Sequence, residues 1–183
     1  YALCVNNFTS SGNGFAVEFG GTGTFLGPEA SFTTVPSAIC LGTPVQITDA
    51  STFALGSITA RNWSFGAGSV PGTATGPGPH TVTFTTPGQH PVVLQLDTDL
   101  GCKVTSIQSV LVYPDVEVDT LIATPECNGG DNGEITITNI KMGTPPYLFS
   151  WEGGPFVPDN TLSNLSVGTY SLVIRDANNC ETD

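Results

Sequence analysis

The cysteines carry the clearest chemical signal in this sequence, because their spacing repeats. Twice along the chain a cysteine is followed by a single tryptophan and then by a second cysteine: Cys40, Trp63, Cys102 and then Cys127, Trp151, Cys180. The tryptophan follows the first cysteine by 23 residues in one set and by 24 in the other. In a β-sandwich, a disulfide can join the two packed sheets with an indole against it. The repeat therefore predicts two tandem sandwiches with disulfides Cys40–Cys102 and Cys127–Cys180, and with both tryptophans in the cores.

Disulfides also indicate how such small domains are stabilised and where the protein is located. Closing loops of 62 and 53 residues would stabilise each domain by roughly 4 kcal/mol on the chain-entropy model. Such bonds persist only in oxidising surroundings, which predicts a secreted or cell-surface protein. Cys4 is left over from the two predicted pairs. It could bridge subunits, pair with a partner outside this sequence, or stay free.

The elements that must position these cysteines are predicted to be strands. Runs rich in β-branched residues, several with period-two alternation, recur between clusters of Gly, Pro and Asn. No window has sustained helical periodicity. The sequence therefore predicts an all-β, immunoglobulin-like chain, with these strand-forming runs: 14–19, 45–48, 81–85, 91–96, 109–113, 134–138 and 171–174.

A short, stiff joint at Pro114 separates the two predicted sandwiches. We expect an N-terminal extension over residues 1–36, a first sandwich over 37–114 and a second over 115–183. The extension contains one alternating apolar strand, formed by Phe15, Val17 and Phe19.

The charge of the chain excludes several classes of partner. Sixteen acidic residues and only four basic ones give a net charge of −12. The basic residues are scattered singly, so nucleic acid and anionic lipid are poor partners. No run approaches the roughly 18 apolar residues of a membrane-spanning helix, so membrane insertion is not expected.

Two blocks of sequence resemble known families of extracellular module. The segments Cys40–Ser51, Asn62–Gly66 and Thr81–Gly88 together resemble a PKD (polycystic kidney disease) domain. The resemblance of the second block, from Cys127 to Cys180, is to the SprB repeat. It rests on four segments: Cys127–Ile135, Pro145–Trp151, Leu165–Tyr170 and Asp176–Cys180. Residues 1–36 match neither family.

The resemblance implies a long surface protein of gliding or related bacteria, exported by the type IX system, in which such modules form adhesin stalks or filaments. Neither family has a catalytic motif to transfer to this chain. Nucleophile elbows and phosphate-binding loops are also absent from the sequence. The chain is therefore not predicted to be an enzyme.

The second block departs from the pattern of the first at its end. The PKD-like block continues past Cys102 through a closing strand, whereas the SprB-like block stops three residues after Cys180. A missing last strand would leave an open edge that favours pairing with a strand of another chain. Insertion of the strand at Phe15, Val17 and Phe19 into an identical subunit would give head-to-tail fibres. The alternative is that the sequence is a fragment lacking its last strand.

Binding residues are sparse in this sequence. Two acidic clusters are candidate calcium ligands, Asp97 with Asp99 and Asp131 with Glu134, although neither has EF-hand spacing. His80 and His90 lack the neighbours of a metal or catalytic site and are predicted to lie in loops. Thr120 lies in Asp119-Thr-Leu121, which resembles a short bacterial O-glycosylation motif.

Two functions are consistent with these features. The first is a non-catalytic structural or adhesive surface module, with neighbouring modules or identical subunits as partners. The second is a glycan- or calcium-dependent binding module of an adhesin or exoenzyme.

Overall fold

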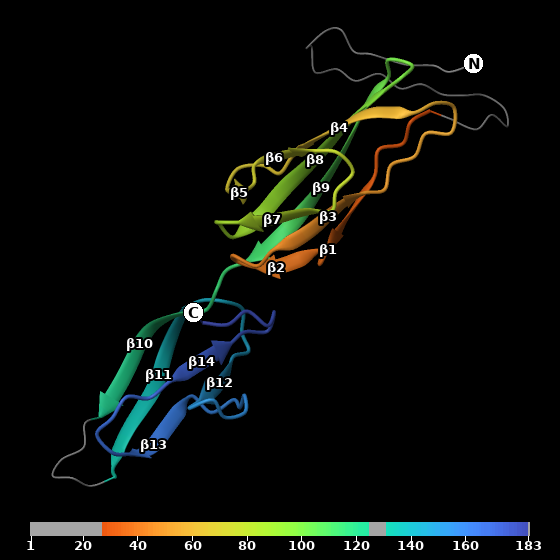
Figure 1. The fold of residues 1–183 in the computed structure, drawn as a ribbon. Helices are drawn as coiled ribbons and strands as arrows, with labels where there is room; N and C mark the ends of the chain where they lie inside the picture. Colours follow the sequence, from red (N-terminus) through yellow and green to blue (C-terminus); the bar gives the residue numbers. More distant parts are fainter. Residues whose placement is uncertain (1–26, 125–130, 183) are drawn as a thin grey trace, which may run out of the picture. The chain divides into compact units, whose positions relative to one another are not determined.

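The computed structural model describes residues 27–124 and 131–182, with the side chains of residues 120 and 122 excluded. All regular structure in this part of the chain is β-strand, as Figure 1 shows. The chain divides into two compact units. The first contains the described residues up to 37 together with 44–84 and 89–110, and the second contains 38–43, 85–88 and the described residues from 111 onward. The predicted all-β, immunoglobulin-like fold is confirmed.

The first unit contains a four-stranded antiparallel sheet with the strand order β1-β3-β7-β5. Its strands are β1 (Phe32–Val35), β3 (Val45–Asp49), β7 (His80–Phe84) and β5 (Ser69–Val70). Every second residue of β3 and β7 is buried: Val45, Ile47, Val82 and Phe84. This period-two burial is the physical reason why the segments form strands with one face in the core.

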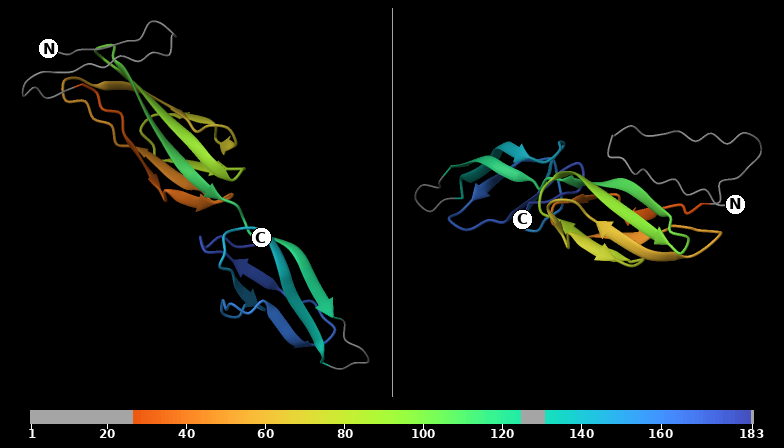
Figure 2. Two further views of the ribbon diagram at one scale, coloured as in Figure 1. Left: turned by 180° about the vertical axis from the view of Figure 1, so that it is seen from behind. Right: turned by 90° about the horizontal axis from the view of Figure 1, so that it is seen from above.

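The second sheet has the order β2-β9-β8-β4-β6. Its strands are β2 (Ala38–Cys40), β9 (Lys103–Tyr113), β8 (Gly88–Thr98), β4 (Ile58–Ser64) and β6 (Thr73–Thr75). β9 continues from the first unit into the second, where its end pairs in parallel with β2. Figure 2 shows the two sheets of the first unit as separate layers.

An aromatic cluster fills the core between these sheets. Trp63 is 2% exposed, and its ring contacts those of Phe32, Phe65 and His80 at centroid distances of 5.3, 6.1 and 5.4 Å. The indole N–H donates to the carbonyl oxygen of Gly76 at 2.7 Å, so the one polar atom of the ring is satisfied. Trp63 therefore packs against other rings, where the sequence predicted a disulfide.

β1 lies inside the segment that the sequence assigned to an N-terminal extension. It pairs with β3 over Phe32 to Val35, and the Phe32 side chain is buried against Trp63. Residues 32–35 are thus part of the first sandwich. The sequence signal was weak because β1 is short and has only one buried side chain.

The second unit is a smaller pair of sheets. One has the order β10-β11-β13, from β10 (Glu117–Thr124), β11 (Gly133–Met142) and β13 (Thr161–Leu165). The other pairs β12 (Leu148–Trp151) with β14 (Leu172–Arg175). Four buried side chains form the core between them: Val116, Ile137, Phe149 and Ile174.

The disulfide pairing predicted from the sequence is wrong. Cys40, at the end of β2, is bonded to Cys180, in the turn after β14, with a Cα–Cα distance of 5.5 Å. The pairs Cys40–Cys102 and Cys127–Cys180 are both excluded by this bond. The physical reason is that β2 pairs with the end of β9 within the second unit, which brings Cys40 close to Cys180. The spacing of the cysteines in the sequence predicts neither the pairing of β2 with β9 nor the bond between Cys40 and Cys180.

One ion pair in the first unit is largely withdrawn from solvent. The Asp49 carboxylate, with a side chain 5% exposed, accepts a hydrogen bond from the Arg61 guanidinium and another from the Ser51 N–H. Burial by itself raises the pKa of Asp49, but the hydrogen bonds from Ser51 and Arg61 together outweigh it and hold the pKa below its usual value. The charged carboxylate is therefore the form that the fold stabilises.

We expect Asp49→Asn to lower the free energy of unfolding by about 1–3 kcal/mol at neutral pH, because Arg61 loses its partner in a half-buried site. Since the folded pKa of Asp49 is depressed, its contribution is present above the usual pKa of an aspartate and is lost as pH falls through the folded value. Urea titrations between pH 2 and 7 should show a shallower acid limb for the variant.

The exposed pair of Lys141 and Glu117 provides the control for that measurement. Both side chains are at least half exposed, so Glu117→Gln should leave the free energy of unfolding almost unchanged. An equal loss in the two variants would contradict the special role of Asp49.

The Cys40–Cys180 disulfide leads to a second prediction. On the chain-entropy model, a bond across a sequence separation of 140 residues stabilises the fold by about 4–5 kcal/mol. Cys40→Ala and Cys180→Ala should therefore cost similar amounts, and the double variant should cost no more than either single one, because all three remove the same bond. Denaturant unfolding measures all three. Additive losses, as from two separate disulfides, would contradict the pairing.

Candidate functional site: an apolar groove beside an open strand edge

A tight turn after β14 reverses the chain and places Cys180. The buried carboxylate of Asp176 accepts hydrogen bonds from the N–H groups of Asn178 and Cys180 at 2.8 and 2.9 Å, and from the N–H of Thr144 at 2.9 Å. Asn179 has a φ of 64°, a left-handed conformation that asparagine tolerates well. The Asp176 carboxylate thus stabilises the turn through these three hydrogen bonds.

The chain then returns along the outer edge of β14. The Thr182 N–H donates to the Ile174 carbonyl at 3.0 Å, and the Ile174 N–H donates to the Thr182 hydroxyl at 3.1 Å. Arg175 pairs with Glu181 through both backbone and side chain. Glu181 and Thr182 therefore pair with the outer edge of β14, at the edge where the sequence was expected to lack a strand.

Beyond Thr182, the same edge of β14 is open within the described part of the chain. The N–H and carbonyl of Ile174 point away from β12. Because backbone groups in a strand alternate in direction, the N–H and carbonyl of Leu172, two residues earlier, also point away from β12. The sheet contains only β12 and β14, and the pairing partner of Leu172 in it is Trp151 on the β12 side. An added strand could hydrogen-bond to Leu172 at this edge.

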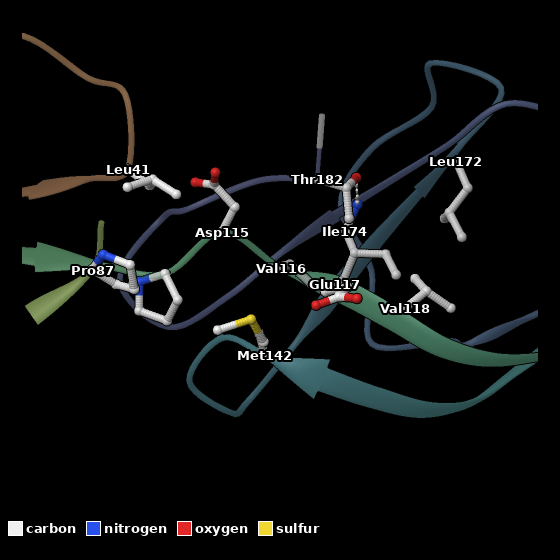
Figure 3. A pocket seen from close by; sticks show the side chains of 11 residues that line it. Leu41, Pro87, Asp115, Val116, Glu117, Val118, Met142, Leu172, Ile174 and Thr182 are labelled. Atoms are coloured by element: carbon white, nitrogen blue, oxygen red, sulfur yellow. Dashed lines mark hydrogen bonds between the residues drawn. The ribbon is translucent and has the colours of Figure 1, made fainter. Parts of the chain in front are cut away.

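An apolar groove with a volume of about 650 Å³ lies beside this edge, within the second unit. Figure 3 shows Val116 and Val118 on one side of it and Leu172 and Ile174 on the other. Strand β10, whose neighbour among the described strands is β11, contributes Val118 to the first wall, and β14 contributes Leu172 and Ile174 to the second. The other lining residues are Leu41, Pro87, Pro114, Asp115, Glu117, Met142 and Thr182.

The charged groups of the groove already have partners. Glu117 accepts a hydrogen bond from the Lys141 ammonium at 2.9 Å, and this hydrogen bond raises the pKa of Lys141. Asp115 also has an interaction partner in the structure. The groove therefore offers apolar walls and an open strand edge, a combination that suits an extended apolar segment better than a charged small molecule.

The first predicted calcium cluster does not bring its carboxylates to a common point. Asp97 accepts hydrogen bonds from Lys103 and Asn62. Asp99 accepts hydrogen bonds from the Ser57 N–H and hydroxyl at 3.0 and 2.9 Å, and these hold its pKa below the usual value. Each carboxylate therefore connects β8 or its following turn to other parts of the first sandwich.

In the second cluster, Glu134 has side-chain hydrogen-bond partners. Glu134 accepts hydrogen bonds from the Thr136 and Ser163 hydroxyls on the β11–β13 sheet, while Asp131 is exposed before β11. Within residues 27–124 and 131–182, no group of three His, Cys, Asp or Glu side chains is arranged to hold a metal ion.

Trp151 and the two histidines lie in or against the cores. Trp151 is half-buried against the second core, and its N–H lies 3.3 Å from the carbonyl oxygen of Asp159. His80 and His90 lie in β7 and β8 rather than in loops, where His80 contacts Trp63 and His90 lies 4.4 Å from the Phe84 ring. The loop prediction for the histidines was wrong because both follow Gly/Pro-rich turns.

Several predicted residues fall outside the described part of the chain. These are Cys4, Cys127 and the strand residues Phe15, Val17 and Phe19. Cys102 is disulfide-bonded, and its partner is not among the described residues. Thr120 pairs with Asn139 across β10 and β11, while its side chain is not described.

The sequence analysis did not single out Asp176 and Thr182, although Asp176-Ala-Asn-Asn is a turn signal.

The strands and their sheets define a class of all-β modules. Among the described residues, no helix is long and apolar enough to span a membrane. Comparison with family profiles makes the assignment more specific. Residues 29–108 match the PKD domain and residues 124–156 match the SprB repeat. The chain therefore contains a PKD domain followed by an SprB repeat, which confirms the resemblance. Both modules are typical of extracellular or surface proteins, and PKD domains are typically non-catalytic.

Solved structures include similar domains. The PKD1 domain of the Vibrio cholerae metalloprotease PrtV is 26% identical with a TM-score of 0.38, and the match covers 47% of this chain and 96% of that one. The PKD1 domain of Vibrio anguillarum Epp is 23% identical with a TM-score of 0.38, covering 47% and 93%. A β-sandwich carbohydrate-binding module is 18% identical with a TM-score of 0.44, covering 68% and 64%. Comparison with curated proteins finds no significant match.

The pairing at Thr182 can be tested by hydrogen exchange. Thr182→Val removes the hydroxyl that accepts the Ile174 N–H, so we expect the exchange rate of that amide to rise about tenfold, consistent with the loss of about 1.4 kcal/mol of protection. Two-dimensional NMR measures it. The Val173 amide, which faces β12, is the internal control, and equal changes at both amides would contradict an edge-specific effect.

Proposed function

We propose that this chain is a non-catalytic structural module of a bacterial surface protein and that it assembles by accepting an extended strand at the outer edge of β14. The single observation that carries the proposal is the open edge at Leu172 beside an apolar groove. Strand addition supplies main-chain hydrogen bonds at the edge, while alternate side chains of the added strand enter the groove.

The chemistry of the groove supports an apolar donor strand. Val118, Met142 and Leu172 leave apolar surface at its walls, and burying such surface yields about 25 cal/mol for each Å² removed from water. The predicted segment with Phe15, Val17 and Phe19 has alternating apolar side chains that fit this requirement. Donation from one copy to the next would be head-to-tail, which generates linear assemblies.

The two modules and the disulfide chemistry support a surface location. PKD domains and SprB repeats are typical of extracellular proteins, and a disulfide such as Cys40–Cys180 persists in oxidising surroundings. Export by the type IX system stays a prediction from the SprB resemblance.

The glycan-binding alternative has less support. Sugar platforms need exposed aromatic faces, whereas Trp63 is buried in the first core and Trp151 packs against the second. Phe156 is covered by the Arg175 guanidinium, which lies 3.7 Å from the ring centroid. No observation in the described residues favours a calcium-dependent ligand over strand addition.

A matched pair of variants tests the assembly. Met142 and Val157 are 38% and 37% exposed, but only Met142 lines the groove. Met142→Glu places a charge where the donor strand would be buried, so it should reduce assembly at least tenfold. Val157→Glu should leave it unchanged. Sedimentation velocity and negative-stain microscopy of concentrated protein measure the result.

Two outcomes would overturn the assembly mechanism. One is wild-type protein that remains as isolated particles at high concentration. The other is that Met142→Glu assembles as well as Val157→Glu. Removing residues 1–26, which spares β1, tests the donor separately: loss of assembly supports the N-terminal strand, and unchanged assembly assigns the donor to another segment.

A further inference from the structure

The Cys40–Cys180 bond changes the covalent route through this chain. The two residues are 140 positions apart in sequence but are joined directly by their sulfur atoms. Any force that pulls the two ends of the chain apart follows the shortest covalent route. That route passes from Cys40 to Cys180 through the disulfide and leaves out the backbone between them.

Most of the fold lies off this route. Strands β3 to β14 all fall between Cys40 and Cys180, and so do both buried cores apart from Phe32 and Ile39 on β1 and β2. Only the residues before Cys40 and after Cys180 remain in series with the applied force. The bond of Cys102 does not alter this conclusion, because an additional cross-link can shorten the route but cannot lengthen it.

We propose that the Cys40–Cys180 disulfide is a tension-bearing staple that prevents the two modules from extending under mechanical load. Sandwich domains in series without such a bond lengthen when they unfold, because each released residue adds about 3.3–3.6 Å of chain. Here the sequence between the bonded cysteines cannot be drawn out while the bond is intact. The length of the loaded chain is then insensitive to whether the strands between them are folded.

The position of Cys40 suits this role. It ends β2, which pairs in parallel with Leu111 to Tyr113 at the end of β9. Cys180 lies in the turn that Asp176 holds with hydrogen bonds to Asn178 and Cys180, and its side chain is fully buried. Both ends of the staple are thus fixed in structured backbone, and burial of the Cys180 sulfur restricts access by thiols in solution.

This proposal concerns a single molecule and does not depend on strand-mediated assembly. A protein that never polymerises could still carry tension through the staple, and a protein that polymerises could lack it. The two proposals therefore fail on different measurements.

Force-clamp spectroscopy of the wild-type chain, with handles attached at residues 1 and 183, tests the staple directly. At a force that unfolds sandwich domains, the oxidised protein should show no extension from the sequence between Cys40 and Cys180. Adding a phosphine reductant should then lengthen the chain by roughly 460–500 Å, which is the separation of 140 residues at 3.3–3.6 Å each. A Cys102→Ser background should give this gain from reduction of one bond.

The matched control is Cys40→Ser/Cys180→Ser in the same background. It should extend by the full length without reductant and show no response when reductant is added. This readout does not require the variant to fold, because an unfolded chain extends equally far. Full extension of the oxidised wild type, or no gain on reduction, would overturn the proposal.

Discussion

The covalent bond between Cys40 and Cys180 is the constraint on which the second unit depends. It holds β2 beside the turn after β14, and the return of the chain along β14 begins at the next residue, Glu181. Among the described residues, the central core cluster of this unit is small, with Val116, Ile137, Phe149 and Ile174 buried in it, and a small core offsets little conformational entropy alone. A cross-link over a long stretch of sequence stabilises such a unit by restricting its unfolded state.

The first unit is stabilised mainly by a larger apolar core with hydrogen-bonded polar groups. Its core combines aliphatic residues on β3, β7 and β8 with the ring cluster around Trp63. The buried polar groups are matched, since the Trp63 N–H and the Asp49 carboxylate both have hydrogen-bond partners. Specific polar contacts thus accompany the apolar core and define one arrangement of the strands.

The roles that we propose for the groove and for the Cys40–Cys180 bond are both structural. Backbone groups at the edge of β14 can accept another strand, and the disulfide fixes the turn that leads to this edge. Neither feature needs a pocket with reactive groups. Three of the candidate calcium ligands, Asp97, Asp99 and Glu134, accept hydrogen bonds from neighbouring hydroxyl, amide or ammonium groups. A module built this way acts through its shape and its connectivity.

The sequence determined the all-β class and the two families, because alternating apolar residues and turn-forming Gly, Pro and Asn are local signals. Only the tertiary structure decided which cysteines pair, since Cys40 meets Cys180 through the pairing of β2 with β9, a contact between residues distant in sequence. The same holds for the groove, because Val118 and Leu172 line it from different sheets. Local pattern specifies strands, whereas long-range packing specifies which strand ends become neighbours.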